Sequence, residues 1–145
     1  MAVLVDTSVL VRLADPADSR NGVARRFVRQ LQEGGSRPLV AVQNLIELWT
    51  VMTRPRSRNG LGLDPDRAQV ILRRFELAFP RLPETPAVYS RWRDLVVRFG
   101  VSGVRSHDAR LVALMLDLGI RRTLTFDGED FRRFESAGIE VICPS

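Results

Sequence analysis

The sequence predicts an α/β domain with a largely parallel sheet. Short apolar runs alternate along the chain with longer segments of helical period, which is typical of this class. The 145 residues are 45% apolar and 27% charged, enough to bury the core of one domain without disulfide bonds or structural metal. The chain contains no internal repeat, low-complexity tract or long linker. We therefore expect residues 1–145 to form a single domain.

Four short apolar runs predict the strands of this sheet. They cover Ala2–Val5, Pro38–Val42, Arg122–Phe126 and Ile139–Cys143, and a weaker candidate lies at Arg81–Pro83. Segments of helical period separate the runs, which favours parallel connections between the strands.

Helices are predicted where apolar residues recur at helical spacing between start and stop signals. The first three are expected at Thr7–Ala14, at Arg20–Glu33 before Gly34-Gly35, and at Val42–Thr53 before Pro55. The segment that follows, residues 54–62 (RPRSRNGLG), is the one extended loop, and it carries three arginines.

The later helices have clear end signals. Asp64-Pro65 supplies a cap and a first helical residue, and the helix that begins there reaches about Ala78. Thr85-Pro86 repeats this signal for a helix that reaches about Phe99. We expect Ser106 to cap the last long helix and Gly119 to end it.

The charged residues exclude several classes of protein. All 22 cations are arginine, so a Walker A phosphate loop, a Schiff-base lysine and a kinase are impossible. Against 17 carboxylates the arginines give a formal charge of +5, and guanidinium groups bind phosphate oxygens well. This composition indicates either a polyanionic partner or a biased genome composition.

The sequence also limits redox chemistry and location. The single cysteine, Cys143, excludes an internal disulfide bond and every multi-cysteine metal site. The longest charge-free apolar run ends at Asp117, and the first residues, MAVLVDTSV, have no basic region. We therefore expect a cytoplasmic protein without a signal peptide or membrane span.

Two acidic residues directly follow predicted strands. Asp6 comes after Val3–Val5, and Asp127 comes after Thr123–Phe126. The carboxyl ends of parallel strands are where open α/β sheets collect their ligands. Each acid also has a purely structural alternative, because Asp6 could cap the next helix and Asp-Gly is an ordinary turn pair.

Three further acids lie on predicted helices or turns. Glu47 shares a polar helix face with Gln43 and Asn44, which is also what a solvated face would show. Asp108 lies in the first turn of a helix, where the dipole favours an acid, but on the face that carries apolar residues. Asp130 fits a capping role in the turn GEDFRRF better than a metal-binding role.

Gathering these carboxylates at one rim would be costly without a cation. Two like charges about 4 Å apart repel by roughly 4 kcal/mol at an effective dielectric constant of 20. Either some of the acids stay protonated, or a hard divalent ion neutralises them. Ligands that offer only oxygen atoms suit Mg²⁺ or Mn²⁺.

Four motifs together resemble the PIN-domain ribonucleases, and more closely the VapC-type toxins of toxin-antitoxin pairs. They are Val5-Asp6-Thr7-Ser8 after the first strand, Glu47 in the helix after the second strand, the run from His107 to Ala113 (HDARLVA), and Thr125-Phe126-Asp127 with Asp130-Phe131. Each motif alone is weak, but their order and spacing match over nearly the whole chain. The loop at residues 54–62 and His107 look like features of a subgroup.

The resemblance implies an α/β/α sandwich with a central, mainly parallel sheet and a metal-dependent ribonuclease. Asp6, Glu47 and Asp108 match the three core acids, and Asp127 matches a fourth, more variable one. Asp6, Asp108 and Asp127 would hold Mg²⁺ or Mn²⁺, with Glu47 as a ligand or as the base that orients water. Partners implied by the resemblance are RNA, an antitoxin protein and a second copy of the chain.

Several other residues are expected to support this chemistry. Thr7 and Thr125 match hydroxyl positions beside the acids, and Asp130 is a third supporting candidate. The candidates for contacts with the RNA backbone are Arg12, Arg54, Arg56, Arg58 and Arg110.

Three alternatives compete with a toxin. A phosphoacceptor signalling domain has a similar acidic pocket but requires a lysine, and the chain has none. A PIN-like module that binds metal without turnover, and a housekeeping ribonuclease of the same fold, both remain open on the sequence alone.

Overall fold

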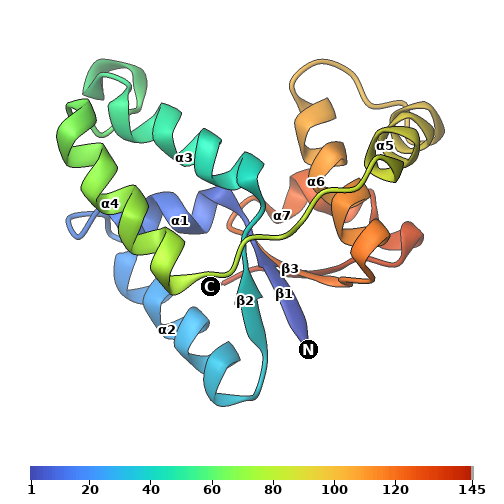
Figure 1. The fold of residues 1–145 in the computed structure, drawn as a ribbon, viewed down its shortest axis with the longest axis horizontal. Helices are drawn as coiled ribbons and strands as arrows, with labels where there is room; N and C mark the ends of the chain where they lie inside the picture. Colours follow the sequence, from blue (N-terminus) through green and yellow to red (C-terminus); the bar gives the residue numbers. More distant parts are fainter. Residues whose placement is uncertain (145) are drawn as a thin grey trace.

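Four short parallel strands form the centre of the computed structural model, which describes residues 1–144 (Figure 1). Their order across the sheet is β2-β1-β3-β4. Leu4 pairs with Leu39 on one side and with Thr123 on the other, and all three strand pairings are parallel. The predicted α/β class with a parallel sheet is confirmed. The strands are β1 (Ala2–Val5), β2 (Arg37–Leu39), β3 (Arg122–Leu124) and β4 (Glu140–Ile142).

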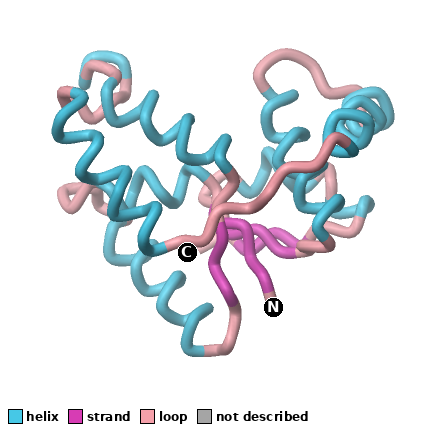
Figure 2. The backbone as a smooth tube through the Cα atoms, viewed as in Figure 1, coloured by secondary structure: helices cyan, strands magenta, loops and turns pink. Residues whose placement is uncertain are grey.

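Helices cover both faces of the sheet, so the expected three-layer sandwich is also confirmed. Figures 1 and 2 show α1 to α4 on one side of the strands and α5 to α7 on the other. The α-helices are α1 (Thr7–Ala14), α2 (Asn21–Glu33), α3 (Val42–Thr53), α4 (Pro65–Ala78), α5 (Ala87–Arg98), α6 (Arg105–Leu118) and α7 (Gly128–Arg132). Two short 3₁₀ turns are η1 (Arg56–Arg58) and η2 (Glu135–Ala137).

The strand β1 contributes side chains to both halves of the hydrophobic core. Its side chains alternate between the two faces of the sheet, as the pleat requires. Val3 and Val5 pack with residues of α1 to α4, whereas Leu4 packs with residues of α5 and α6. All three side chains are fully buried, so β1 is the central element on which both helical layers rest.

Strand β1 has its predicted bounds, but the other three strands are shorter than the sequence predicted. β2 ends at Leu39, and Val42 is already the first residue of α3. The expected weak strand at Arg81–Pro83 is reduced to a single bridge between Val40 and Arg81. The buried apolar run of β2 continues through Val40 and Ala41 into α3. Apolar character alone does not distinguish such a continuation from a longer strand.

Most helix ends lie within two residues of their predicted positions. Asp64 caps α4 by accepting a hydrogen bond from the backbone N–H of Arg67 (2.9 Å), and Gly119 ends α6 in the left-handed region at φ 71°. The expectation for Ser106 was wrong, because α6 begins at Arg105 and Ser106 lies inside its first turn. Within the described residues, no helix is long and apolar enough to cross a membrane.

The connections between strands locate a crevice. The chain passes from β1 to β2 on one side, then crosses through α3 to α6 to reach β3 on the other side of β1. Such a reversal of direction leaves a gap above the carboxyl ends of the two central strands. In this fold the reversal lies between β1 and β3, so the residues just after these strands face the gap.

Candidate active site

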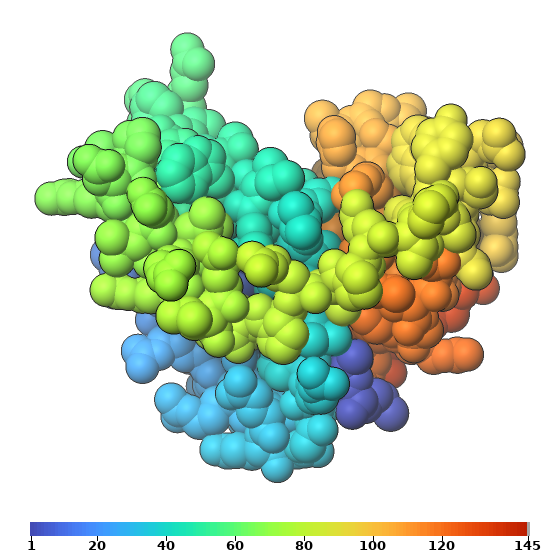
Figure 3. Space-filling view, viewed as in Figure 1, coloured from blue at the N-terminus to red at the C-terminus, as the bar shows by residue number. Residues whose placement is uncertain are grey.

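A cavity of about 440 Å³ lies at the carboxyl ends of β1 and β3. Figure 3 shows the molecular surface hollowed between the segment around residues 54–62 and the segment that leads into α6. Acidic side chains from four separate segments line this acidic cavity. Its lining residues are Asp6, Thr7, Ser8, Val11, Arg12, Glu47, Val51, Arg54, Asn59, Val104, Arg105, His107, Asp108, Asp127 and Asp130.

Asp6 is the most deeply buried of these acids. It occupies the N-cap position of α1, but its side chain makes no capping hydrogen bond and is only 6% exposed. Instead its Oδ2 accepts hydrogen bonds from Ser8 Oγ (2.9 Å) and Thr125 Oγ1 (2.8 Å). The structural alternative of a helix cap therefore does not describe this side chain, which is held at the base of the cavity.

Burial also changes the acidity of Asp6. Loss of solvent raises its pKa to about 6, and the nearby charge of Asp127 adds to the rise. The hydrogen bonds from Thr125 and Ser8 oppose this effect because they stabilise the ionised form. A buried carboxyl group of this kind either keeps its proton or is ionised beside a cation.

Ser8 belongs to the site but is absent from the predicted site residues. Its hydroxyl donates to Asp6 and accepts a hydrogen bond from the backbone N–H of Phe126 (3.0 Å). Thr125 behaves in the same way, since its Oγ1 also accepts from the backbone N–H of Asp127 (2.9 Å). The two hydroxyls thus connect the ends of β1 and β3. The position of Ser8 two residues after Asp6, in the first turn of a helix, was the available signal.

Glu47 is held by polar residues that the sequence suggested were solvated. Thr7 Oγ1 donates to Glu47 Oε1 (2.8 Å) and accepts from Asn44 Nδ2 (3.1 Å). Asn44 is fully buried and Gln43 is 9% exposed, so the polar face of α3 points into the protein. Gln43 Nε2 donates to the backbone carbonyl of His107 (2.9 Å), which ties α3 to α6 beside the cavity.

Asp108 faces the same cavity from the first turn of α6. Its neighbours Leu111, Val112 and Met115 are buried, as the sequence predicted for this helix face. Its own side chain is 22% exposed. Burial, the charge of Asp6 and the charge of Asp130 raise the pKa of Asp108 to about 7, although Arg105 lowers it. Asp6 and Asp108 are therefore close enough to repel each other.

Asp127 and Asp130 complete the acidic wall. Asp127 is exposed and lies at the N-terminus of α7 without making a side-chain cap. Asp130 pairs with Arg105, whose Nη1 is also 3.6 Å from Asp108 Oδ2. Arg105 is the second residue that the sequence prediction missed. Its position three residues before Asp108 puts both side chains on one face of α6.

The loop at residues 54–62 forms the opposite rim. It folds back on the end of α3 through backbone hydrogen bonds from Gly62 to Arg54 and from Leu61 to Val51 (both 2.9 Å). A side chain on Gly60 would collide with the backbone of Arg54, so only glycine fits there. This packing fixes Arg54 and Asn59 where they line the cavity.

The five arginines expected to contact RNA lie in different places. Arg12 and Arg54 line the acidic cavity, and Arg12 also pairs with Asp18 (3.0 Å). Arg56 and Arg58 lie in η1 and are exposed, but they do not line the cavity.

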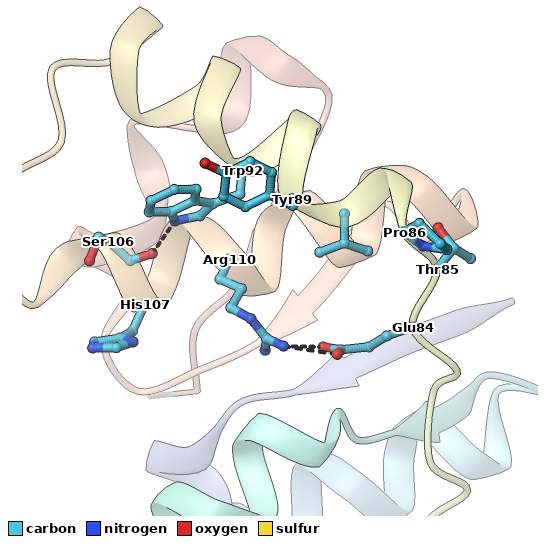
Figure 4. A pocket seen from close by; sticks show the side chains of 9 residues that line it. Glu84, Thr85, Pro86, Tyr89, Trp92, Ser106, His107 and Arg110 are labelled. Atoms are coloured by element: carbon cyan, nitrogen blue, oxygen red, sulfur yellow. Dashed lines mark hydrogen bonds and ion pairs between the residues drawn. The ribbon is translucent and has the colours of Figure 1, made fainter.

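Arg110 points away from the acidic cavity. Figure 4 shows it paired with Glu84 in a second cavity of about 450 Å³, beside Tyr89 and Trp92. Its Nη2 lies 2.7 Å from a Glu84 carboxylate oxygen, and its Nη1 donates to Gln43 Oε1 (2.8 Å). The geometry gives Arg110 a structural role between α3, α6 and the segment before α5.

The donor set of the acidic cavity suits a hard divalent ion. Its candidate ligands are carboxylate and hydroxyl oxygens, which Mg²⁺ and Mn²⁺ prefer over softer metals. Among residues 1–144, no three His, Cys, Asp or Glu side chains are arranged closely enough to hold one metal ion. The types of side chain therefore fit such an ion, whereas shared coordination would require the carboxylates to move closer together.

Comparison with known families gives one match that covers most of the chain. The family described as PIN domain matches residues 3–136. No curated protein sequence matches the chain.

Several solved structures share the fold. The chain is similar to VapC20 of Mycobacterium tuberculosis, described as a sarcin-ricin loop cleaving toxin, with 24% identity, a TM-score of 0.64, and coverage of 95% of this chain and 96% of that one. VapBC2 of Rickettsia felis, bound to a promoter DNA fragment, has 12% identity, a TM-score of 0.71 and coverage of 98% and 99%. FitAcB of Neisseria gonorrhoeae has 16% identity, a TM-score of 0.63 and coverage of 98% and 96%. With the family match over residues 3–136 and the sandwich described above, the chain belongs to the PIN domain family.

Proposed function

We propose that residues 1–145 form a single-domain, metal-dependent ribonuclease that hydrolyses RNA phosphodiester bonds and acts as the toxin of a toxin-antitoxin pair. One observation carries the catalytic part of the proposal: five carboxylates from four segments line one cavity, and Asp6 and Asp108 each lie where burial opposes their ionisation. Carboxyl groups whose pKa values are raised by burial and by neighbouring charges in a shared cleft are typical of functional sites.

Asp6, Asp108 and Asp127 are the proposed ligands of Mg²⁺ or Mn²⁺. When bound, such an ion lowers the pKa of a water molecule and offsets the negative charge of the scissile phosphate. Ser8 and Thr125 orient Asp6 by donating to its Oδ2, which keeps the carboxylate at the base of the cavity. Asp127 is the most exposed of the three and lies nearest to solvent.

Glu47 is the proposed residue that orients the attacking water. Thr7 and Gln43 both donate to its carboxylate, at 2.8 and 3.5 Å, which fixes the side chain toward the cavity. A held carboxylate with no arginine partner among the ion pairs of the described residues can accept a proton or a hydrogen bond from water. Glu47 could equally complete the metal coordination, and both roles need the same orientation.

Arginines at the rim would hold the RNA backbone. Arg12 and Arg54 border the acids directly, and Arg56 and Arg58 continue the positive surface along the loop. A bare acidic pocket would repel RNA, so these cations and the bound metal together are needed for binding. Arg110 is not among the proposed RNA contacts because Glu84 and Gln43 occupy its guanidinium.

Cleavage assays with purified protein test the catalytic proposal. We expect cleavage of RNA in Mg²⁺ or Mn²⁺, loss of cleavage in EDTA, and loss in D6N and in D108N, each still folded by circular dichroism. D94N is the matched control, since Asp94 is an exposed carboxylate on α5 away from the cavity. Cleavage that persists in both D6N and D108N would end the proposal.

The toxin role and the partners rest on the similar structures, among which VapC20 is described as a toxin and VapBC-5 of Mycobacterium tuberculosis as a member of the VapBC family of toxin-antitoxin systems. We propose an antitoxin protein that covers the acidic cavity, and a homodimer to which the exposed apolar side chains of Val42 and Ile46 on α3 could contribute. Expression of the chain alone should arrest growth, and co-expression of its antitoxin should restore it. Unimpaired growth with active protein would favour a housekeeping nuclease. A pure monomer at micromolar concentration would contradict the dimer.

A further inference from the structure

Arg105 stands apart from the other cations of the acidic cavity. Of the three arginines that line it in the described part of the chain, Arg12 pairs with Asp18 and Arg54 donates to the backbone carbonyl of Asn59 (3.2 Å). Arg105 instead reaches the acids of the cavity itself. Its Nη1 pairs with Asp130 on α7 and lies 3.6 Å from Asp108 Oδ2 on its own helix.

An ordinary helix-surface ion pair does not describe this contact. Pairs three residues apart on one helix are common and contribute little. Here the tighter contact is to Asp130, which comes from another element, so Arg105 bridges α6 and α7 across the wall of the cavity. Both carboxylates are only 22% exposed, whereas the Arg105 side chain is 49% exposed and can move outward.

We propose that Arg105 is a built-in counter-ion of the active site. In the metal-free protein it holds Asp108 and Asp130 together, and it releases Asp108 when a divalent ion binds. This inference rests on the proposed function, because it assumes that Asp108 is a metal ligand. It makes Arg105 a positioning residue that acts through Asp108 and is not itself a ligand.

Electrostatics gives the direction of the effect on metal binding. A guanidinium and a divalent ion attract the same carboxylate and repel each other. At about 6 Å the repulsion between a unit charge and a dication amounts to about a tenfold change in affinity, even at the dielectric constant of water. Removal of Arg105 should therefore tighten metal binding, although it leaves two partly buried acids unpaired in the metal-free state.

Titration of Mn²⁺ into purified wild-type, R105Q and R105K protein tests the inference, with binding followed by calorimetry and unfolding by thermal melts in EDTA. R105Q should bind Mn²⁺ about tenfold more tightly than wild type and should melt at a lower temperature in EDTA. R105K keeps the charge and should bind Mn²⁺ like wild type. R91Q is the control, because Arg91 pairs with Asp117 on the far side of α6 from the cavity contacts.

A second variant makes the test independent of folding defects in R105Q. D130N frees Arg105 from its stronger partner, so the guanidinium is available to Asp108 and Mn²⁺ affinity should fall. In the double variant R105Q/D130N no guanidinium remains to be freed, so the Mn²⁺ affinity should stay close to that of R105Q, and this departure from the sum of the two single effects measures the coupling between Arg105 and Asp130. Loss of stability alone cannot produce opposite changes in affinity.

The possible outcomes separate this inference from the proposed function. Tighter Mn²⁺ binding by R105Q together with weaker binding by D130N supports it. If wild type binds Mn²⁺ but R105Q binds it equally or more weakly, the role of Arg105 is wrong and the metal-dependent nuclease still stands. If wild type and R105Q both fail to bind Mn²⁺ or Mg²⁺, the proposed metal chemistry and this inference fail together.

Discussion

Thr125 Oγ1 donates a hydrogen bond of 2.8 Å to Asp6 Oδ2, and this bond links the ends of the two central strands. Asp6 follows β1 and Thr125 follows β3, so the parallel pairing of these strands brings the two side chains together. The same hydroxyl accepts from the backbone N–H of Asp127. One threonine therefore positions two of the three proposed metal ligands.

Replacement of Thr125 by valine should weaken metal binding without disturbing the core. Valine has nearly the same shape but cannot donate to Asp6 or accept from Asp127. Loss of the donor also raises the pKa of Asp6 further, because that hydrogen bond favours the ionised form. Loss of a residue that orients a metal ligand typically lowers metal affinity 10- to 100-fold. We therefore expect the Mn²⁺ dissociation constant of T125V, measured by calorimetry, to be at least about tenfold larger than that of wild type.

T123V is the matched control for T125V. Thr123 is fully buried in β3, two residues before Thr125, but its hydroxyl donates to the backbone carbonyl of Leu4 (3.1 Å) and not to a carboxylate. We expect T123V to lose stability while it keeps its Mn²⁺ affinity. Equal affinities for T125V and wild type would show that Thr125 does not position Asp6.

Asp108 should destabilise the metal-free protein at neutral and alkaline pH. Its folded pKa of about 7 lies above the ordinary value of 3.8, so the folded state binds its proton more tightly than the unfolded chain does. The contribution of this group to the free energy of unfolding therefore falls as pH rises from about 4 to about 7. D108N should stabilise the protein in EDTA at pH 8 by about 1 to 2 kcal/mol, after allowance for residual solvent contact.

Thermal melts in EDTA at pH 8 and pH 5 measure this effect. A gain of about 1 kcal/mol corresponds to roughly 4 °C in a chain of this size. The gain should shrink at pH 5, where Asp108 in the wild type is already protonated. D94N should melt like wild type at both pH values. A melting temperature of D108N at or below that of wild type at pH 8 would contradict the assigned environment of Asp108.

Metal binding should strengthen as pH rises. Asp6 and Asp108, with pKa values of about 6 and about 7, must both be ionised to act as ligands. The apparent Mn²⁺ affinity should therefore increase between pH 5.5 and 8, and binding near pH 6 should release protons. Calorimetry in buffers of different ionisation enthalpy counts those protons. An affinity that is constant over this pH range would show that neither acid binds the metal.

Arg54 and Arg110 should respond differently when RNA cleavage is measured at several salt concentrations. Arg54 lines the acidic cavity, whereas Arg110 is held by Glu84 and Gln43. Loss of a phosphate contact lowers the slope of log kcat/KM against log salt by about 1. We expect this change in R54Q and no change of slope in R110Q. The reverse pattern would place the RNA on the other side of α6.

The positions of Asp6 and Asp127 could be predicted because they follow strands. In a parallel sheet all carboxyl ends point the same way, so an acid after each central strand must face one crevice. The orientation of Glu47 could not be predicted in this way. Its polar neighbours Gln43 and Asn44 turned out to be buried, and only the packing of α3 against α1 and α6 decides that.

The arginines show the limit of sequence reasoning more clearly. Arg110 follows Asp108 by two residues, and two residues turn a helix by about 200°, so the two side chains cannot share a face. Helical spacing could therefore have excluded Arg110 and suggested Arg105. The contact between Arg105 and Asp130 depends on how α7 packs beside α6, and this packing cannot be predicted from the spacing of residues in the sequence.

Anomalous diffraction from crystals soaked in Mn²⁺ is the most direct test of the account. The central claim is that Asp6 and Asp108 share one divalent ion. We predict an anomalous peak in the acidic cavity with carboxylate oxygens of both residues about 2.1 Å away, and no peak in D108N crystals. Suppose that the wild-type protein cleaves RNA in Mn²⁺, but its soaked crystal shows no anomalous peak in this cavity or only a peak that contacts neither residue. Either result would contradict the claim that Asp6 and Asp108 share one ion.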